Sequence, residues 1–209
     1  VSRNLLAACV QAGIEGFIFS STAAVYGNPH VLPVTEDAPL MPLAPYGTSK
    51  LMTEMMLRDV AAAGSMRYVA LRYFNVAGAD PQGRTGQATP DATHLIKVAC
   101  ETACGKRDAM TIFGEDYNTP DGTCVRDYIH VSDLAAAHVA ALDYLVAGGK
   151  NEALNCGYGT GYSVRQVIET LEGIAGIKLK TINGPRRIGD AESVYAASER
   201  IRQILSWTP

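Results

Sequence analysis

The chain has 209 residues, of which 47% are apolar and 19% charged, so it can bury a substantial core and is not disordered. Its 20 glycines and 10 prolines are close to ordinary usage, which excludes collagen-like and low-complexity classes. The net charge of −3 comes from 18 basic and 21 acidic side chains spread along the chain, which indicates no nucleic-acid partner. A small molecule is therefore the expected partner.

The most apolar stretch, residues 134–146, is interrupted by His138 and Asp143 and is too short to span a bilayer. We therefore expect no membrane anchor. The five cysteines form an odd set without a CxxC motif or zinc-ligand spacing. They indicate reduced thiols of a cytoplasmic protein, and we expect no metal site.

The first part of the chain alternates helices with short apolar strands. The expected elements are a helix over residues 1–12, a buried strand over 16–20, a helix over 46–62 and a second buried strand over 68–73. Strand, helix and strand in this order predict a right-handed parallel crossover. The proline-rich residues 27–45 form a long loop, which in a compact domain is usually functional and could cover a substrate.

The alternation continues after a glycine-rich segment at residues 78–90. The expected elements are a helix over 92–104, strands over 110–113 and 123–131, a helix that ends near Gly148, and a strand over 153–156. Either Ser132 or Asp133 is expected to cap the helix that ends at Gly148. Residues 163–166 fit a capping box that opens a helix to residue 174, and Ser198 is expected to cap the last helix. The whole pattern predicts an α/β fold.

The chain begins inside a helix without an initiator Met and stops directly after its last helix. We expect it to be a fragment at both ends.

Tyr46 and Lys50 are the first candidate pair for chemistry, because residues four apart lie on one face of a helix. The spacing alone is weak evidence, since a surface Tyr above a solvated Lys produces it equally well. Ser20, Ser21 and Thr22 strengthen it, because these hydroxyls lie at the carboxyl end of a buried strand, where open α/β sheets bind ligands. A nearby ammonium favours the phenolate form of a tyrosine, so the pair could transfer a proton.

Four ordered motifs over more than half of the chain resemble the UDP-glucose 4-epimerases, a family of extended short-chain dehydrogenases/reductases. The motifs are residues 20–27 (SSTAAVYG), 45–50 (PYGTSK), 71–79 (LRYFNVAGA) and 121–131 (DGTCVRDYIHV). The segment 185–190 (PRRIGD) is the last strong block of the resemblance, which extends from residue 3 to residue 209. Together the motifs are far more specific than the Tyr–Lys spacing alone.

The resemblance implies a Rossmann-type doubly wound parallel sheet that holds NAD, and a smaller C-terminal α/β lobe that holds a UDP-sugar. We expect residues 1–77 to be part of the NAD-binding domain and residues 78–209 to form the substrate lobe, with 124–148 packing back on the first domain. The implied activity is the NAD-dependent interconversion of UDP-glucose and UDP-galactose through a 4-keto intermediate. A homodimer is the implied assembly of the complete enzyme.

The resemblance also implies roles for individual residues. The expected catalytic residues are Tyr46, which takes the proton from the sugar 4-hydroxyl, Lys50, which binds the nicotinamide ribose, and Thr22, which holds the sugar. The expected cofactor-binding residues are Ser20, Ser21, Tyr46, Lys50, Tyr73 and Phe74. The expected substrate-binding residues are Thr22, Asn75, His94, Ile112, Phe113, Arg126, Arg187, Asp190 and Val194. From periodicity alone Ile112 and Phe113 would be ordinary core residues, and each arginine alone would be a solvated surface charge.

The sequence also departs from the family pattern. The glycine-rich phosphate loop of a Rossmann domain is absent from these 209 residues, so we expect the segment alone to be inactive. Thr22 replaces the family's usual serine, and His94 stands where other members have Asn.

Two alternatives remain open. The first is a nucleotide-sugar 4,6-dehydratase, which needs an acid/base pair directly after the strand hydroxyls. This chain has Ala23 and Ala24 there, which disfavours a dehydratase. A catalytically incompetent remnant would share every motif, and the nucleotide sequence upstream of Val1 would distinguish it from a truncated enzyme.

Overall fold

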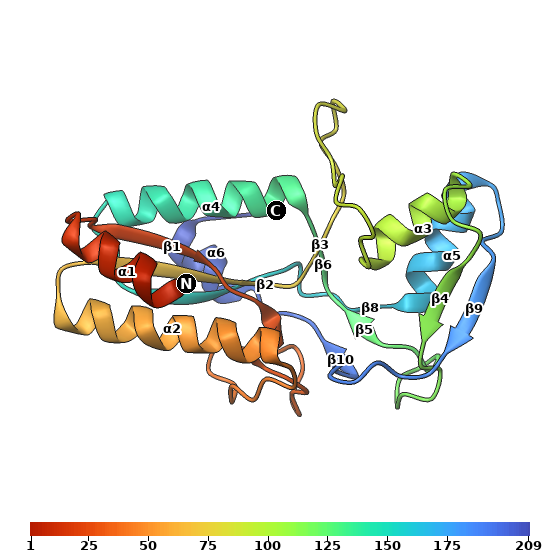
Figure 1. Ribbon diagram of the computed structural model, residues 1–209, viewed down its shortest axis with the longest axis horizontal. Coiled ribbons are helices and arrows are strands. Elements are labelled where there is room, and N and C mark those ends of the chain that lie inside the picture. Colours follow the sequence, from red (N-terminus) through yellow and green to blue (C-terminus); the bar gives the residue numbers. More distant parts are fainter.

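The computed structural model describes residues 1–209 and shows a larger body and a smaller lobe side by side (Figure 1). The larger body is built on a three-stranded parallel sheet of β1 (Gly16–Ser20), β2 (Arg67–Tyr73) and β7 (Glu152–Cys156), with β2 in the middle. Register pairs Ser20 with Leu71 and Leu71 with Leu154, so all three strands end at the same edge. The expected parallel crossover is confirmed.

Helices cover both faces of this sheet, as in a doubly wound Rossmann-type fold (Figure 1). On one face lie α1 (Ser2–Gln11) and α2 (Pro45–Ala63), whose Leu6 and Leu57 pack with Met66. On the other face lie α4 (Val131–Val146) and α6 (Glu199–Leu205), which form the largest apolar core with β2 and β7. Burial on both faces explains why the strands read as continuous apolar runs.

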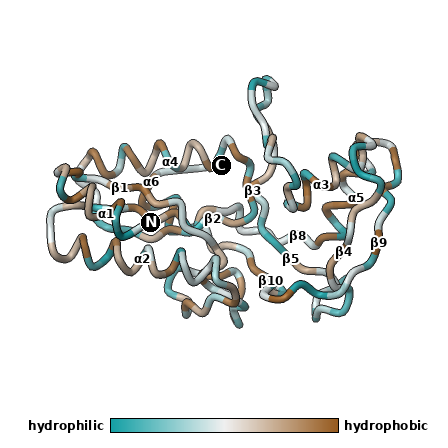
Figure 2. The backbone as a smooth tube through the Cα atoms, in the orientation of Figure 1, coloured by the Kyte–Doolittle hydropathy of each residue, from teal (hydrophilic) through white to brown (hydrophobic).

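The smaller lobe packs α3 (Leu95–Ala103) and α5 (Val164–Ala175) on the parallel pair β4 (Met110–Phe113) and β9 (Thr181–Gly184). Its core contains Ala99, Met110, Ile112, Ile168 and Leu179. In Figure 2 the apolar positions of α5 recur along the helix, as expected for a helix with one buried face.

Short elements join the two parts. They are η1 (Ala23–Val25), β3 (Asn75–Ala77), β5 (Val125–Arg126), β6 (Tyr128–His130), β8 (Tyr162–Ser163) and β10 (Ser193–Val194). Strand β3 pairs with β6, while β5 lies between β10 and β8. The 124–148 segment does pack on the larger body through α4, but so do β7 and α6, which the sequence left in the smaller lobe.

Several local expectations hold and others are wrong. The capping box of Ser163 and Gln166 is confirmed. The expected single strand over 123–131 is broken at Asp127, whose buried carboxylate accepts backbone N–H groups from two other segments. Neither Ser132 nor Asp133 caps α4, because the His130 ring accepts the Ser132 N–H at 3.2 Å instead.

Ser198 precedes α6, but its hydroxyl donates to the carbonyl of Gly157 at 2.7 Å and does not cap the helix. None of the helices combines the length and hydropathy of a bilayer-crossing segment.

Candidate functional site

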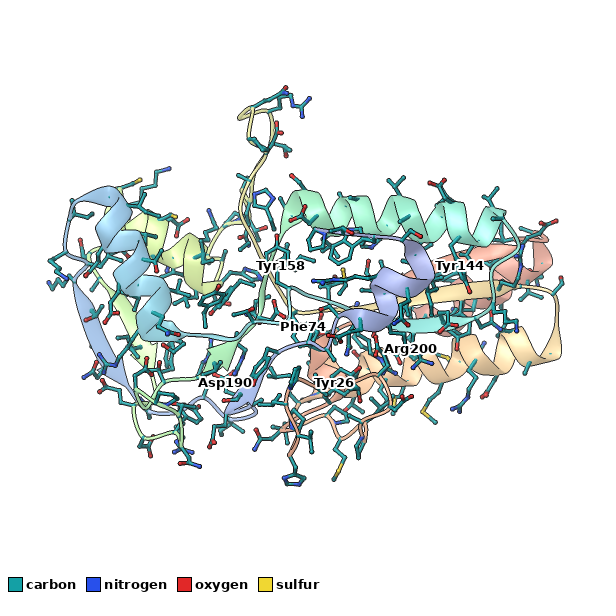
Figure 3. All side chains as sticks on the ribbon, turned by 180° about the vertical axis from the view of Figure 1, so that it is seen from behind. Tyr26, Phe74, Tyr144, Tyr158, Asp190 and Arg200 are labelled. Carbon is teal, nitrogen blue, oxygen red and sulfur yellow. The ribbon has the colours of Figure 1, made fainter.

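One cleft at the junction of the two parts brings together many of the residues expected from the sequence. Those that line it are Thr22, Tyr73, Phe74, Asn75, Arg126, Asp190 and Val194. The rest of its lining consists of Ala23, Ala24, Gly27, Leu43, Ala44, Gly189 and Ala191. In Figure 3, Phe74 lies on the side of the larger body and Asp190 toward the smaller lobe. The cleft therefore joins the carboxyl ends of the sheet strands to the smaller lobe, the usual place for ligands in such sheets.

Tyr46 and Lys50 lie in the first turns of α2, beside this cleft. Pro45 occupies the first helical position, where its missing N–H has no cost. A Cβ at Gly47 would lie 2.6 Å from the carbonyl oxygen of Ala24, so only glycine lets the start of α2 approach η1 this closely. The Lys50 ammonium lies 5.7 Å from the centre of the Tyr46 ring, which is 54% exposed.

The three consecutive hydroxyl residues at the end of β1 each have a different hydrogen-bond partner. Thr22 lines the cleft, and its Oγ1 accepts the N–H of Ala24 at 3.2 Å. Ser21 is fully buried and donates to the Glu54 carboxylate, so its side chain is not available to a cofactor, contrary to the expectation. Ser20 hydrogen-bonds Nε2 of His138 at 3.1 Å, and its backbone carbonyl accepts from Lys50 at 2.9 Å.

Tyr73, Phe74 and Asn75 follow one another where β2 ends and β3 begins. Burial, followed by the neighbouring Tyr46, raises the pKa of Tyr73, so its hydroxyl stays neutral at neutral pH. Phe74 is buried and lines the cleft, and the backbone N–H of Asn75 donates to the carbonyl of Asp127 at 3.0 Å. The exposed Asn75 side chain is left free for a ligand.

Charged side chains gather at the smaller-lobe end of the cleft. Asp190 accepts from Nε of Arg187 at 2.8 Å and lies 3.9 Å from Nη2 of Arg126. The Arg187 guanidinium also lies over the ring of Phe113, 4.9 Å from its centre. Arg126 donates to the carbonyls of Ala191 and Glu192, which fixes the chain around Asp190. Two guanidinium groups and one carboxylate beside an aromatic ring can bind a nucleotide.

Two expected substrate residues are placed elsewhere. Ile112 is 3% exposed and packs in the core of the smaller lobe, so its side chain does not reach the cleft. His94 lies in a neighbouring cleft with Lys97 and hydrogen-bonds Gln87 through its Nδ1 at 2.7 Å. Val194, in contrast, lines the main cleft and also packs with Phe74.

Sequence reasoning missed two buried charged groups behind the site. Arg72 pairs with Glu54 in the core, and Asp127 accepts the N–H groups of Tyr158 and Gly159 at 3.0 and 2.9 Å. Burial raises the pKa of Asp127, and the backbone N–H groups oppose this. Arg72 is a charged residue within the apolar run of β2, a signal that could have revealed its buried pair.

The fold is that of a doubly wound α/β protein with a cleft at the carboxyl ends of its sheet strands. The chain belongs to the NAD dependent epimerase/dehydratase family, whose model matches residues 1–157. It is 60% identical over 208 residues to the UDP-glucose 4-epimerase of Azospirillum brasilense and 46% identical over 206 residues to that of Rhizobium meliloti. The two alignments cover 100% and 99% of this chain, and 60% and 63% of the relatives' own lengths.

Solved structures give the same result. The UDP-glucose 4-epimerase of Bifidobacterium longum in complex with NAD+ and UDP matches with a TM-score of 0.95 at 41% identity, over 99% of this chain and 62% of that chain. The UDP-Glc/GlcNAc 4-epimerase of Campylobacter jejuni matches with a TM-score of 0.79 at 50% identity, over 100% and 63%. The chain thus spans a little over 60% of the length of these relatives, and the expected family resemblance is confirmed.

Proposed function

We propose that the full-length protein interconverts UDP-glucose and UDP-galactose by NAD-dependent 4-epimerisation. The observation that carries this proposal is the arrangement of one cleft between two sets of groups. Thr22, Arg126 and Asp190 line this cleft, and the Tyr46–Lys50 pair begins two residues after Ala44 of its wall. This arrangement supports a proton-transfer group and a nucleotide-binding group that act on one ligand. The 60% identity to a UDP-glucose 4-epimerase supports the same reaction.

In this proposal Tyr46 takes the proton from the sugar 4-hydroxyl and later returns it. The Lys50 ammonium lies 5.7 Å from the centre of the Tyr46 ring, and its hydrogen bond to the Ser20 carbonyl keeps it beside the tyrosine. Thr22 presents a hydroxyl from the cleft wall that can hold the same sugar oxygen. The exposed Tyr46 ring leaves room for the substrate to approach.

The residues at the strand ends fit the nicotinamide end of NAD. The half-buried Tyr73 and the buried Phe74 offer aromatic surface for a nicotinamide ring, and the Lys50 ammonium offers a donor for the hydroxyls of its ribose. Tyr73, Phe74 and Lys50 would hold the nicotinamide beside C4 of the sugar, where NAD would supply hydride transfer at that carbon. The 209 residues contain no glycine-rich phosphate loop, and we propose that they do not turn over substrate by themselves.

At the other end, Arg126 and Arg187 are proposed to bind the pyrophosphate, and Asp190 to accept a hydrogen bond from the uridine ribose. The Phe113 ring, 39% exposed, offers a face on which the base can stack once the Arg187 guanidinium turns toward phosphate. The proposed role of Asn75 is to contact the same region of the ligand.

We also propose a cytoplasmic homodimer. All five cysteines are free thiols, which suits a reducing compartment. Exposed apolar side chains on the adjacent helices α1 and α2, namely Leu5, Val10, Met52 and Met55, offer a surface for a second copy. Size-exclusion chromatography with light scattering tests the dimer, and a monomer at micromolar concentration contradicts it.

The decisive experiment is incubation of the full-length protein with NAD and UDP-galactose, with the sugar products separated by chromatography and weighed by mass spectrometry. We expect UDP-glucose of unchanged mass. A product lighter by one water would instead identify a 4,6-dehydratase, for which Ala23 and Ala24 supply no acid/base pair. No product, with NAD and UDP bound, would identify a catalytically incompetent relative.

A further inference from the structure

A buried ion pair lies behind the cleft without touching it. Arg72 on β2 is 5% exposed and Glu54 on α2 is 7% exposed. Nη2 of Arg72 lies 2.6 Å from Oε2 of Glu54, and Nε donates to both carboxylate oxygens at 3.1 and 3.2 Å. Such pairs add little net stability, because the loss of hydration offsets the attraction. The main consequence of the Arg72–Glu54 pair is therefore that it fixes the relative positions of β2 and α2.

Glu54 connects this pair to the proposed catalytic helix. It follows Lys50 by four residues on α2, one helical turn further along on the same side. Its Oε1 also accepts a hydrogen bond from the hydroxyl of Ser21. Ser21 lies between Ser20, whose carbonyl binds Lys50, and Thr22, which lines the cleft. One carboxylate thus fixes α2 both to β2 and to the turn after β1.

Arg72 connects the pair to the long loop of residues 27–44. Its Nη1 donates to the Tyr26 hydroxyl at 3.0 Å and to the Glu36 carbonyl at 3.2 Å. Tyr26 in turn donates to Oδ1 of Asn155 at 2.6 Å, and Nδ2 of Asn155 donates to the Val34 carbonyl at 2.8 Å. The far end of this loop, Leu43 and Ala44, forms one wall of the cleft. In Figure 3, Tyr26 lies close to Phe74, in whose apolar cluster it packs.

Tyr26 and Arg72 each keep one protonation state at neutral pH. Burial raises the pKa of Tyr26 to about 12, so its hydroxyl keeps the proton that it donates to Asn155. An arginine keeps its charge under all ordinary conditions and offers donors in a fixed plane. A pair of apolar residues could fill the same volume, but it would not set the rotation of α2.

We propose that Arg72 and Glu54 are positioning residues for the reaction proposed above. They hold α2, the turn at residues 20–22 and the loop at residues 27–44 in one arrangement, so that Tyr46 and Lys50 face the cleft that this loop walls. Neither residue touches substrate, and the inference rests on the proposed function for its kinetic consequence. The two residues are proposed to set the geometry of Tyr46 and Lys50 and to leave nucleotide binding unaffected.

The test compares Arg72→Lys and Glu54→Gln with a control in the full-length protein. Leu145→Ala is the control, because Leu145 is buried in the same body but packs at Gly16, the end of β1 opposite Ser20. We expect the two test variants to lose at least tenfold in kcat, while KM and the Kd for UDP stay within twofold. The control is expected to lower Tm as much or more with kcat within twofold of the wild type. Unchanged kcat in the test variants, or a rise in the UDP Kd that matches the loss of kcat, would overturn the inference.

Two further measurements keep the test decisive. If the Arg72 and Glu54 variants do not fold, Ser21→Ala and Tyr26→Phe each remove one connection of the network and should lower kcat without changing the UDP Kd. Hydrogen exchange should rise over residues 27–44 in the test variants and not over α3 or α5. Hydrogen exchange can be measured without turnover. If the wild type has no epimerase activity, the proposed function is refuted, but exchange over residues 27–44 still tests the positioning role. Unchanged exchange over 27–44 counts against it.

Discussion

The ammonium of Lys50 donates a hydrogen bond to the backbone carbonyl of Ser20 at 2.9 Å. This contact ties the start of α2 to the end of β1, two segments 30 residues apart in the chain. It leaves the ammonium 5.7 Å from the Tyr46 ring and 5.1 Å from the Phe19 ring. The backbone of β1 therefore holds the lysine beside the tyrosine.

Replacing Tyr46 with Phe should remove the proton acceptor and leave the fold unchanged, because more than half of the side chain is exposed. We expect a loss of about 10²- to 10⁴-fold in kcat, as is usual for a general base. Steady-state kinetics with UDP-galactose and isothermal titration with UDP measure turnover and binding separately. The UDP Kd should stay close to the wild-type value.

Tyr162→Phe is the matched control, since Tyr162 is also exposed but lies on β8 in a different cleft. It should retain full turnover. Near wild-type activity in Tyr46→Phe would show that another group takes the proton.

Arg126, which lines the cleft, and Arg187, which contacts its Asp190, should respond differently to substitution by Met. Arg187 is half exposed and contacts Asp190, so its loss should weaken UDP binding by about 10- to 100-fold, as for a hydrogen bond to a charged group, with little change in Tm. Arg126 also holds the carbonyls of Ala191 and Glu192, so its loss should weaken binding and lower Tm as well. Titration calorimetry and thermal unfolding distinguish the two.

Arg165→Met provides the control, because Arg165 is an exposed arginine of the smaller lobe that pairs with Glu115 outside the cleft. It should leave UDP binding unchanged. Equal Tm losses at Arg126 and Arg187 would contradict the assigned difference.

Local patterns in the sequence predicted most of the fold. The apolar run that forms β1 and the capping box of α5 depend on neighbouring residues, and both appear where expected. The break at Asp127 could not be predicted, because its cause lies in N–H groups that arrive from residues 158, 159 and 196. The placement of β7 in the larger sheet likewise depends on pairing with β2, more than 75 residues earlier.

The site shows the same limit at the level of single side chains. Motif order was enough to bring Thr22 and Asp190 to one cleft, although they are far apart in the chain. It could not distinguish Ser21, which turns inward to Glu54, from Thr22 beside it. Thr22 bonds locally to the Ala24 N–H, whereas Ser21 is directed by Glu54, a tertiary partner on α2 that the sequence pattern does not reveal.

Glu36 should make the stability depend on pH. Burial raises the pKa of its carboxyl, and hydrogen bonds from the backbone only partly oppose this. The folded state thus binds a proton more readily than the unfolded state, so this residue's contribution is greatest in acid and is lost as pH rises through the raised pKa. Glu36→Gln keeps an oxygen to accept the Asn155 N–H and should remove that pH dependence.

The measurement is urea unfolding of both proteins from about pH 4.5 to pH 8, with the difference in the free energy of unfolding plotted against pH. The wild type should lose stability relative to Glu36→Gln as pH rises. Asp37→Asn is the control, because Asp37 is exposed and next in the chain. A difference that does not vary with pH, or that grows in the opposite direction, would contradict the assignment.

Val194 should allow the cleft to accept a 2-acetamido sugar in addition to glucose and galactose. Its side chain is 7% exposed and lines the cleft together with Asp190 and Thr22, at the position that the resemblance places beside the sugar C2 group. A small apolar side chain there leaves room for an acetyl group, whereas a tyrosine ring would fill it. The Campylobacter jejuni relative, 50% identical, is described as a UDP-Glc/GlcNAc 4-epimerase.

The test compares kcat/KM for UDP-galactose and UDP-N-acetylgalactosamine in the wild type and in Val194→Tyr. An unfilled apolar pocket discriminates against the smaller sugar by only about 1–3 kcal/mol, so the wild type should use both. Val194→Tyr should lose the acetamido substrate and keep UDP-galactose, because a ring that projects into the cleft clashes with the larger group alone. Val194→Ile is the control for added apolar volume without a ring. Lack of acetamido turnover in the wild type, or its persistence in Val194→Tyr, would place the C2 pocket elsewhere, with the neighbouring Tyr195 as the next residue to test.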